Sequence, residues 1–264
     1  MRYALCLEYQ GTQFHGFQKQ THQPNTIQAH LEAALSFVAN EPIHLVCAGR
    51  TDAGVHATHQ IIHFDTQAFR TERSWVLGTN SQLPPTIRVS WAKIVPESFH
   101  ARFSAQSRTY HYIILSQPVP PAIMRPLVTW EIYPLQVAAM EQAAQYWLGE
   151  HDFTSFRAQY CQAKTPIRTV QALSFQETTL PKTQKILFSI TANAFLHHMI
   201  RNMLGTLLLV GRGKYPPEWA KSVLDAKNRT AAGPTAPPNG LYLTGVEYPE
   251  TFGLPRARHA SPLQ

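Results

Sequence analysis

The chain has 264 residues, which is enough for one large domain or two smaller ones. Its hydrophobic fraction of 44% argues against intrinsic disorder, and no apolar run approaches the roughly 20 residues of a membrane-spanning helix. The 23 basic and 16 acidic side chains give a net charge of +7, as expected of a polyanion-binding protein, although a merely soluble basic protein can have the same composition.

The positive charge is unevenly distributed along the chain. Residues 1–100 carry seven basic and seven acidic side chains, whereas residues 101–264 carry sixteen and nine, so the whole excess lies in the second part. Three widely spaced cysteines, Cys6, Cys47 and Cys161, fit buried thiols in a reducing cytosol better than disulfides or a metal site. We therefore expect a cytoplasmic protein with a basic second domain.

The first elements alternate between strand and helix patterns. Residues 1–9 become polar too soon for a secretory signal and predict a first strand. Residues 11–20 form a polar loop with Phe14 and Phe17, which suits contacts with RNA bases or, equally, a loop pinned by two core phenylalanines. From Thr26, a plausible N-cap, apolar residues recur at a spacing of three to four and predict a helix.

Two apolar runs, residues 43–47 and 60–64, each predict a short strand. The stretch between them, residues 48–57, reads AGRTDAGVHA and contains two glycines. Glycine allows backbone angles that other residues avoid, so this stretch is a shaped turn rather than a flexible linker. Helices packed on a largely antiparallel sheet are the fold that this order of elements favours.

Asp52 stands at the tip of this turn, and Arg50 precedes it by two residues. An aspartate held rigid between two strands, with a guanidinium beside it, has what a nucleophile or a general base needs. Thr-Asp-Ala-Gly is also a good turn sequence, because aspartate can bond to its own backbone two residues later. The local pattern leaves the catalytic and the structural interpretation open.

The later elements are a helix and strand pair, a tyrosine-rich strand and a second group of helices. Residues 107–115 predict a strand with Tyr110 and Tyr112 on one face, where paired tyrosines serve cross-strand packing or function. Arg201 falls within an apolar helix pattern, and a buried arginine must be paired or meet a ligand. The other predicted elements are helices at 75–80, 137–148 (closed by Gly149), 195–210 and 217–226, and strands at 87–95, 167–176, 185–192 and 241–248. The tail with Arg256, Arg258 and His259 is expected to be loosely held.

A metal site is the competing interpretation of the histidines near Asp52. His56, His59 and His63 lie close in sequence, but His59 and His63 would be separated by roughly 13 Å along a strand. That distance is too long for one zinc ion, whose bonds to nitrogen are about 2 Å. The adjacent His197 and His198 face two directions on a helix. No phosphate-binding loop or serine nucleophile elbow is present, so ATP, NAD and serine hydrolysis are disfavoured.

Motifs along nearly the whole chain resemble one family, the tRNA pseudouridine synthases A. They run in the family's order from residue 3 to about residue 248, and the Gly-Arg-Thr-Asp-Ala-Gly block is highly specific. The matching motifs are AGRTDAGVHA, FHARF, RTYHY, GEHDF, PIR, NAFLHHMIRNMLG and APPNGLYL. This resemblance overrides the local pattern and favours the catalytic interpretation of Asp52.

The resemblance implies an α+β fold of two domains, residues 1–104 with the catalytic loop and residues 105–264 with the basic excess. Antiparallel sheets would join across a central catalytic cleft with flanking helices, in a homodimer. The implied reaction converts uridine to pseudouridine at positions 38, 39 and 40 of the tRNA anticodon stem-loop. It requires no metal, nucleotide or redox cofactor, and the partner is tRNA rather than a membrane.

The resemblance also assigns roles to individual residues. Asp52 matches the catalytic aspartate, which attacks C1′ of the flipped uridine or removes the C2′ proton. Arg50 would pair with Asp52 and keep it ionised. Tyr110 matches the active-site tyrosine, whose ring packs on the base and whose hydroxyl helps to remove the C5 proton. Arg201 and Leu243 are the weaker carry-overs and would line the uracil pocket.

Three positions depart from the family's usual form. Gln10 and Phe17 stand where aspartate and tryptophan are more usual, and His59 replaces a common glycine. These changes bear on the RNA contacts rather than on the chemistry. The alternative function is an RNA-binding or tRNA-folding protein of the same fold without catalysis, and the intact aspartate, arginine and tyrosine set favours the isomerase.

Overall fold

The structure is a computed structural model that describes residues 1–257, so the tail residues Arg258 and His259 lie outside the described part. Within that part, five α-helices and ten strands confirm the predicted α+β class. The chain forms two compact units, Met1–Thr109 with the segment from Tyr242 onward, and Tyr110–Leu241. The predicted boundary, after residue 104, lies five residues before this division, which falls between Thr109 and Tyr110 inside a strand. Most of the last strand belongs to the first unit, although it was predicted as part of the second domain.

The first unit is built on a sheet whose centre is the pair β1 (Arg2–Tyr9) and β3 (His56–Asp65). These strands are antiparallel, from Arg2 opposite Asp65 to Tyr9 opposite Ala57. Strand β4 (Ile87–Val95) pairs with the other edge of β1, and the short β2 (Leu45–Cys47) pairs with β3. The last strand, β10 (Leu241–Glu247), runs parallel to β3 and contributes the only parallel pairing described in this unit.

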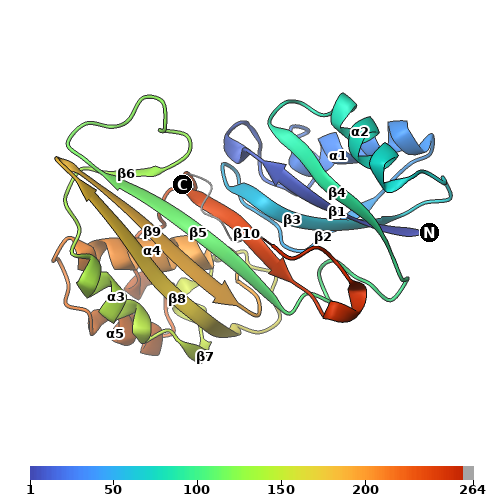
Figure 1. The fold of residues 1–264 in the computed structure, drawn as a ribbon. Coiled ribbons are helices and arrows are strands. Elements are labelled where there is room, and N and C mark those ends of the chain that lie inside the picture. The colour runs from blue at the N-terminus through green and yellow to red at the C-terminus, as the bar shows by residue number, and fades with distance from the viewer. Residues whose placement is uncertain (258–264) are drawn as a thin grey trace. The chain divides into compact units, whose positions relative to one another are not determined.

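Helices α1 (Ile27–Ala39) and α2 (Glu72–Gln82) lie side by side against this sheet (Figure 1). The predicted cap is confirmed, because the Thr26 side chain accepts a hydrogen bond of 3.3 Å from the Ala29 amide. Trp75 of α2 packs on Tyr3 and Phe64, with ring centroids 5.3 and 5.0 Å apart. This aromatic cluster forms the core between the helices and the sheet.

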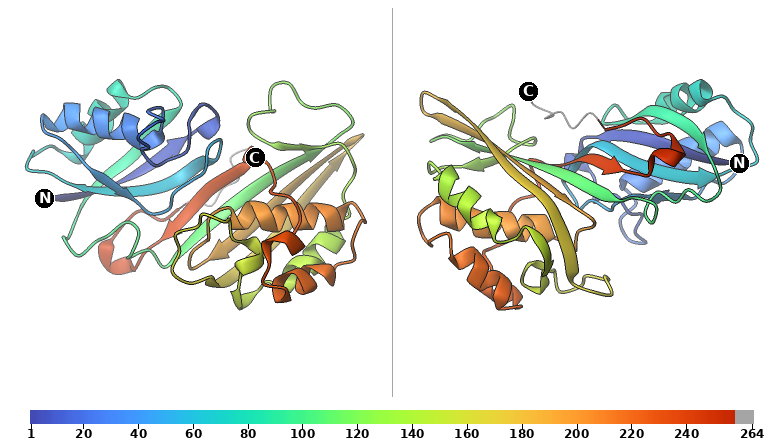
Figure 2. Two further views of the ribbon diagram at one scale, coloured as in Figure 1. Left: turned by 180° about the vertical axis from the view of Figure 1, so that it is seen from behind. Right: turned by 60° about the horizontal axis from the view of Figure 1, so that its bottom comes forward.

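The strands of the second unit are hydrogen-bonded in the order β5-β9-β8-β7, with β6 pairing in parallel with β5. Its three helices pack against one another on one side of these strands (Figure 2). Its strands are β5 (Ser107–Ser116), β6 (Thr129–Glu131), β7 (Gly149–Asp152), β8 (Ile167–Leu180) and β9 (Thr183–Ala192), and its helices are α3 (Val137–Gln145), α4 (Met199–Gly211) and α5 (Trp219–Asp225).

Two predicted helix boundaries in this unit are wrong. Helix α3 ends at Gln145, and Gly149, with a φ of 92°, opens strand β7 rather than closing the helix. Helix α4 begins at Met199 instead of residue 195, because His198 has a left-handed φ of 60° that cannot belong to a right-handed helix. The short strands β6 and β7 were not predicted.

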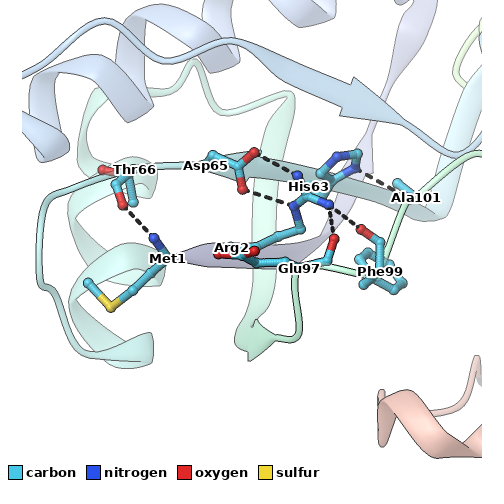
Figure 3. Close-up of polar contacts among 8 residues, drawn as sticks. All are labelled: Met1, Arg2, His63, Asp65, Thr66, Glu97, Phe99 and Ala101. Carbon is cyan, nitrogen blue, oxygen red and sulfur yellow. Dashed lines mark hydrogen bonds and ion pairs between the residues drawn. The ribbon is translucent and has the colours of Figure 1, made fainter.

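The N-terminal end of the first sheet is closed by an ionic cluster, which we call the N-terminal clamp (Figure 3). Arg2 donates to both carboxylate oxygens of Asp65 at 2.9 and 2.7 Å. The Arg2 guanidinium also donates to the carbonyl oxygens of Glu97 and Phe99. The Met1 amino group donates to the Thr66 carbonyl oxygen at 2.9 Å. The clamp therefore ties β1, β3 and the segment after β4 together.

A histidine lies beside the clamp. The His63 Nδ1 atom accepts a hydrogen bond of 3.1 Å from the Ala101 amide (Figure 3). Burial, reinforced by the charge of Arg2, lowers the pKa of His63 to about 4. The bond from Arg2 holds the pKa of the Asp65 carboxyl below its usual value. Both groups thus keep at neutral pH the protonation state that their hydrogen bonds require.

None of the helices within residues 1–257 has the combination of length and apolar character needed to cross a membrane.

Candidate active site

The Asp52 loop, residues 48–55, connects β2 to β3 as predicted. The Ala48 amide donates to the Ile61 carbonyl oxygen at 2.8 Å, so the loop leaves a paired strand edge. A bond of 3.1 Å from the Val55 amide to the Asp52 carbonyl oxygen closes the turn, and Gly54 supplies its positive φ of 81°. Asp52 is half-buried, whereas Arg50 is exposed. The turn therefore holds the Asp52 backbone by its own hydrogen bond.

Buried neutral side chains hold the first half of this loop. The Gln60 carboxamide donates to the Gly49 carbonyl oxygen at 2.5 Å and accepts from the Gly49 amide at 3.4 Å. The Tyr9 hydroxyl lies 2.8 Å from the Thr51 hydroxyl, and the Gln60 amide donates to Tyr9 at 3.4 Å. Gln60 thus pairs with the backbone of Gly49 much as a neighbouring strand would, and Tyr9 fixes the residue before Asp52.

The loop of residues 10–20 packs directly on the Asp52 loop. The Phe17 amide donates to the Thr51 carbonyl oxygen at 3.0 Å. A Cβ atom added at Gly16, whose φ is 87°, would lie 2.9 Å from that same oxygen, and one added at Gly11 would lie 1.9 Å from the Val55 carbonyl oxygen. Only glycine fits these two positions without moving the Asp52 loop.

The phenylalanines of the same loop belong to the core. Phe14 is 5% exposed and Phe17 is 1% exposed, so the structural interpretation of the loop, pinned by two core rings, is the one that is confirmed. Phe17, which departs from the family's usual tryptophan, packs its ring 6.1 Å from that of Tyr9. The departure lies in the support of the Asp52 loop rather than on an exposed surface.

The β3 histidines each contact protein groups. His56 accepts from the Gly11 amide at 3.1 Å and stacks on the ring of Tyr242 at 4.6 Å. The His59 Nδ1 atom lies 3.4 Å from the Cys6 sulfur. His63 accepts a hydrogen bond from the Ala101 amide, so each of the three histidines of β3 has a partner within the protein.

Arg108 links the Asp52 loop to the segment that follows β4. Its buried guanidinium donates to the carbonyl oxygens of Ala48 at 3.0 Å, Arg102 at 2.6 Å and Ala105 at 3.1 Å. The planar guanidinium of arginine can donate to several separated acceptors at once, which the single ammonium group of a lysine could not do. The start of the Asp52 loop is therefore fastened from this side as well.

Leu243, the predicted pocket residue of the first unit, lies fully buried in β10. It is paired with Ala57, on the strand that leaves the Asp52 loop. The structure thus brings Leu243 to the strand that continues from Asp52.

Tyr110 and Arg201, the predicted residues of the second unit, are both anchored within it. The Tyr110 ring meets Phe195 edge to face, with centroids 5.2 Å apart. Arg201 donates through Nε to the Ala236 carbonyl oxygen at 2.8 Å, and the Ala236 amide returns a bond of 3.0 Å to the Arg201 carbonyl oxygen. The sequence predicted that this helix arginine needs a partner, and a backbone carbonyl oxygen is one of its partners.

Tyr112, the neighbour of Tyr110 on the same strand face, has a structural role. Its hydroxyl donates to the Pro237 carbonyl oxygen at 2.9 Å and accepts from the Thr129 hydroxyl at 2.6 Å. Burial raises the pKa of Tyr112, so its hydroxyl stays protonated. Tyr112 is thus the tyrosine of this pair whose hydroxyl is used in structural hydrogen bonds.

Sequence reasoning missed three residues that support the Asp52 loop, namely Tyr9, Gln60 and Arg108. Two of them carried a signal: Gln60 is polar beside the apolar Ile61 and Ile62, and Arg108 is the one charged residue of the predicted strand 107–115. Tyr9 looked like an ordinary strand residue. A carboxylate on a loop held in this way can serve as a nucleophile or a general base with a fixed direction of approach.

Comparisons with known proteins agree on one family. A family model described as tRNA pseudouridine synthase matches residues 5–104 and 143–249. The tRNA pseudouridine synthase A of Nitrosococcus oceani is 52% identical over 256 residues, 97% of each chain. The protein of the same name from Pseudomonas aeruginosa is 49% identical over 99% of this chain and 90% of its own.

A third relative, from Coxiella burnetii, is also named tRNA pseudouridine synthase A and is 48% identical over 97% of this chain and 96% of its own. Identity at this level over nearly the full length extends through both compact units. The chain belongs to the tRNA pseudouridine synthase family, whose members are isomerases that convert uridine to pseudouridine.

Proposed function

We propose that this protein isomerises uridine to pseudouridine at positions 38, 39 and 40 of the tRNA anticodon stem-loop. The observation that carries the proposal is the placement of Asp52 on a loop fixed by Gln60, Tyr9 and the Phe17 amide. The stem-loop positions are the ones that the sequence motifs imply, and the net charge of +7 favours a polyanionic substrate.

The net reaction moves the ribose from one ring atom of uracil to another. The N1–C1′ bond breaks, a C5–C1′ bond forms, and the proton leaves C5 while N1 gains one. No atom or electron is gained or lost, so no oxidant, reductant or co-substrate enters the balance. The target uridine first leaves the base stack, which costs a few kcal/mol.

Asp52 opens the reaction by one of two routes. Its carboxylate attacks C1′ and releases uracil, or it removes the C2′ proton and releases uracil as a glycal forms. Both routes need an ionised carboxylate with a fixed direction, and the supported loop supplies the direction. Arg50, two residues earlier in the same loop, pairs with Asp52 in our proposal and favours its ionised form.

Three further residues contact the uracil in our proposal. Tyr110 packs its ring on the base and assists the loss of the C5 proton, and its edge-to-face contact with Phe195 limits the directions of that ring. Arg201 binds a uracil oxygen, while its own backbone and Nε are fixed by Ala236. Leu243 supplies an apolar wall.

The remaining properties follow the same resemblance. We propose a homodimer of the 29.8 kDa chain that acts on tRNA in the cytoplasm and uses no metal or organic cofactor. Light scattering on the purified protein tests the dimer, since a monomer would have half the expected mass.

The decisive experiment compares the wild type with Asp52→Asn on an unmodified tRNA that carries uridines at positions 38 to 40. Pseudouridine is mapped by chemical labelling, and tRNA binding is measured in parallel. We expect pseudouridine at these positions with the wild type only, and binding by both proteins. Asp65→Asn makes the same chemical change at the other end of β3 and should keep the activity.

Other outcomes discriminate between the candidate functions. If the wild type and the variant both bind tRNA and neither modifies it, the protein is an RNA-binding or tRNA-folding relative. Full activity of Asp52→Asn would refute the role of Asp52. Single-uridine tRNAs then report which of the three positions is modified.

A further inference from the structure

Three neutral side chains form a chain of hydrogen bonds beneath the Asp52 loop. They run from the Gln60 amide to the Tyr9 hydroxyl at 3.4 Å and from there to the Thr51 hydroxyl at 2.8 Å. Gln60 also bonds to both backbone polar groups of Gly49. All three side chains are buried, with Gln60 fully inaccessible.

The chain of bonds begins on the sheet and ends beside Asp52. Tyr9 is the last residue of β1, and Gln60 lies within β3, so both side chains stand on paired strands. Gly49 and Thr51 stand on the loop, on either side of Arg50. These bonds therefore fix the peptide group that precedes Asp52 relative to the paired strands β1 and β3.

Buried polar groups keep such partners firmly. A buried amide or hydroxyl that loses its partner is left unsatisfied in a medium without water, so the bonded arrangement is strongly preferred. The Thr51 hydroxyl also fixes its own side-chain rotamer when it bonds to Tyr9, since β-branched side chains have few alternatives. Catalytic groups must be held within about 0.5 Å of their productive geometry, and this arrangement acts at that scale.

We propose that Tyr9 is a positioning residue that directs Asp52 through Thr51, with Gln60 as its support. The inference rests on the proposed function, because it assigns Asp52 as the catalytic group. Tyr9 acts without charge, so it sets the direction of the carboxylate and not its ionisation. The contribution of Tyr9 is therefore to the chemical step rather than to tRNA binding.

The test uses single-atom changes that keep the packing. Tyr9→Phe removes the hydroxyl, and Thr51→Val replaces the other hydroxyl by a methyl group of similar size. Tyr3→Phe is the matched control, because Tyr3 is also a buried residue of β1 whose hydroxyl makes one bond of 2.9 Å, to the Arg70 carbonyl oxygen. Single-turnover rates, tRNA binding and melting temperatures are measured for all of them.

We expect Tyr9→Phe to lower the single-turnover rate at least about tenfold, since small displacements of a catalytic group can cost up to about 100-fold. The tRNA dissociation constant should change by less than about twofold, and the pH dependence of the rate should keep its midpoint. Thr51→Val should have a similar effect, and the double variant should be no slower than the slower single variant. Tyr3→Phe should keep the wild-type rate.

Specific results would overturn the inference. A Tyr9→Phe rate within about twofold of the Tyr3→Phe rate would show that the hydroxyl does not position Asp52. Additive losses in the double variant would show that the two hydroxyls act separately, and a shifted pH midpoint would indicate an effect on charge. If the wild type makes no pseudouridine, or Asp52→Asn still makes it, the proposed function fails together with the inference. If those two proteins behave as proposed and Tyr9→Phe does not, the inference alone fails.

Discussion

Strands β1 and β3 are joined by side-chain bonds at both ends, and the two ends use different chemistry. At one end Arg2 stands opposite Asp65 in an ionic clamp, and the Asp65 side chain is 62% exposed. At the other end Tyr9 stands opposite Ala57, and the bonds beneath the Asp52 loop are neutral and buried. The same pair of strands thus has a solvent-exposed ion pair at one end and buried, neutral hydrogen bonds at the other.

The difference between the two ends shows that neutral hydrogen bonds can position a loop without shifting the ionisation of a carboxylate on it. Fixed charges beside a carboxylate shift its ionisation, as Arg2 does for Asp65. Hydroxyl and amide groups set direction with a much weaker electric field. In the first unit, Thr51 and Gly49 next to Asp52 are therefore held by the neutral Tyr9 and Gln60, and the charged Arg108 contacts only the start of the loop at Ala48. The Arg2–Asp65 ion pair lies at the remote end of the strands.

The largest effect should come from replacing Gly11, where the neutral end is most tightly packed. In Gly11→Ala the new Cβ would lie 1.9 Å from the Val55 carbonyl oxygen, so the Asp52 loop must move. We expect the rate of pseudouridine formation to fall by about 100-fold or more. Gly78→Ala is the control: its Cβ would meet only the Val38 side chain, at 3.0 Å, and alanine favours the helix. Equal rates for the two variants would contradict this packing argument.

A smaller effect, on stability alone, is expected at the ionic end. Arg2→Met keeps the aliphatic stem but removes the bonds to Asp65 and to the carbonyl oxygens of Glu97 and Phe99. Each such bond is worth about 1 kcal/mol, so we expect a loss of about 1–2 kcal/mol in the free energy of unfolding. Denaturant titration measures this loss, and the single-turnover rate should stay within about twofold of wild type. A large loss of activity in Arg2→Met would show that the N-terminal clamp also affects the Asp52 end of the strands.

The smallest effect is a pH dependence at the ionic end. Because the folded pKa of His63 is lowered to about 4, folding favours its neutral form. The contribution of His63 to stability is present above its unfolded pKa of roughly 6.5 and is lost as the pH falls from there towards 4. Burial also lowers the pKa of the neighbouring His100, which acts in the same direction, whereas Asp65 loses its contribution only at still lower pH.

His63→Asn provides the test of this dependence, because the asparagine oxygen can replace Nδ1 as acceptor for the Ala101 amide without titrating. Melting temperatures measured from pH 7 to pH 4 should fall less steeply for the variant than for the wild type. Parallel curves would show that His63 does not titrate in this window.

The sequence predicted the local features of the Asp52 loop and most of the strands around it. Thr26 as a helix cap, residues 87–95 as a strand and Asp52 between two strands follow from neighbouring residues. The residues that support the Asp52 loop depend instead on how distant strands pair. The partnership of Tyr9 with Thr51 spans 42 positions and depends on the register between β1 and β3, which local patterns do not reveal.

The start of helix α4 illustrates the second limit. Phe195 and Leu196 continue the apolar pattern of the helix, but the left-handed backbone of His198 interrupts it. Histidine is among the residues that tolerate this conformation, yet nothing in its neighbours signals it. Periodicity therefore located the helix and misplaced its first turn.

The bonds that hold the Asp52 loop also determine when the loop can form. Its partners include Tyr9 and Arg108, at separations of 42 and 60 residues. Contacts between distant residues form late in folding, because a long segment of chain must first be closed. A growing chain thus contains Asp52 long before it contains a directed carboxylate, and the loop gains its shape only after Arg108 has been synthesised and the first sheet has paired.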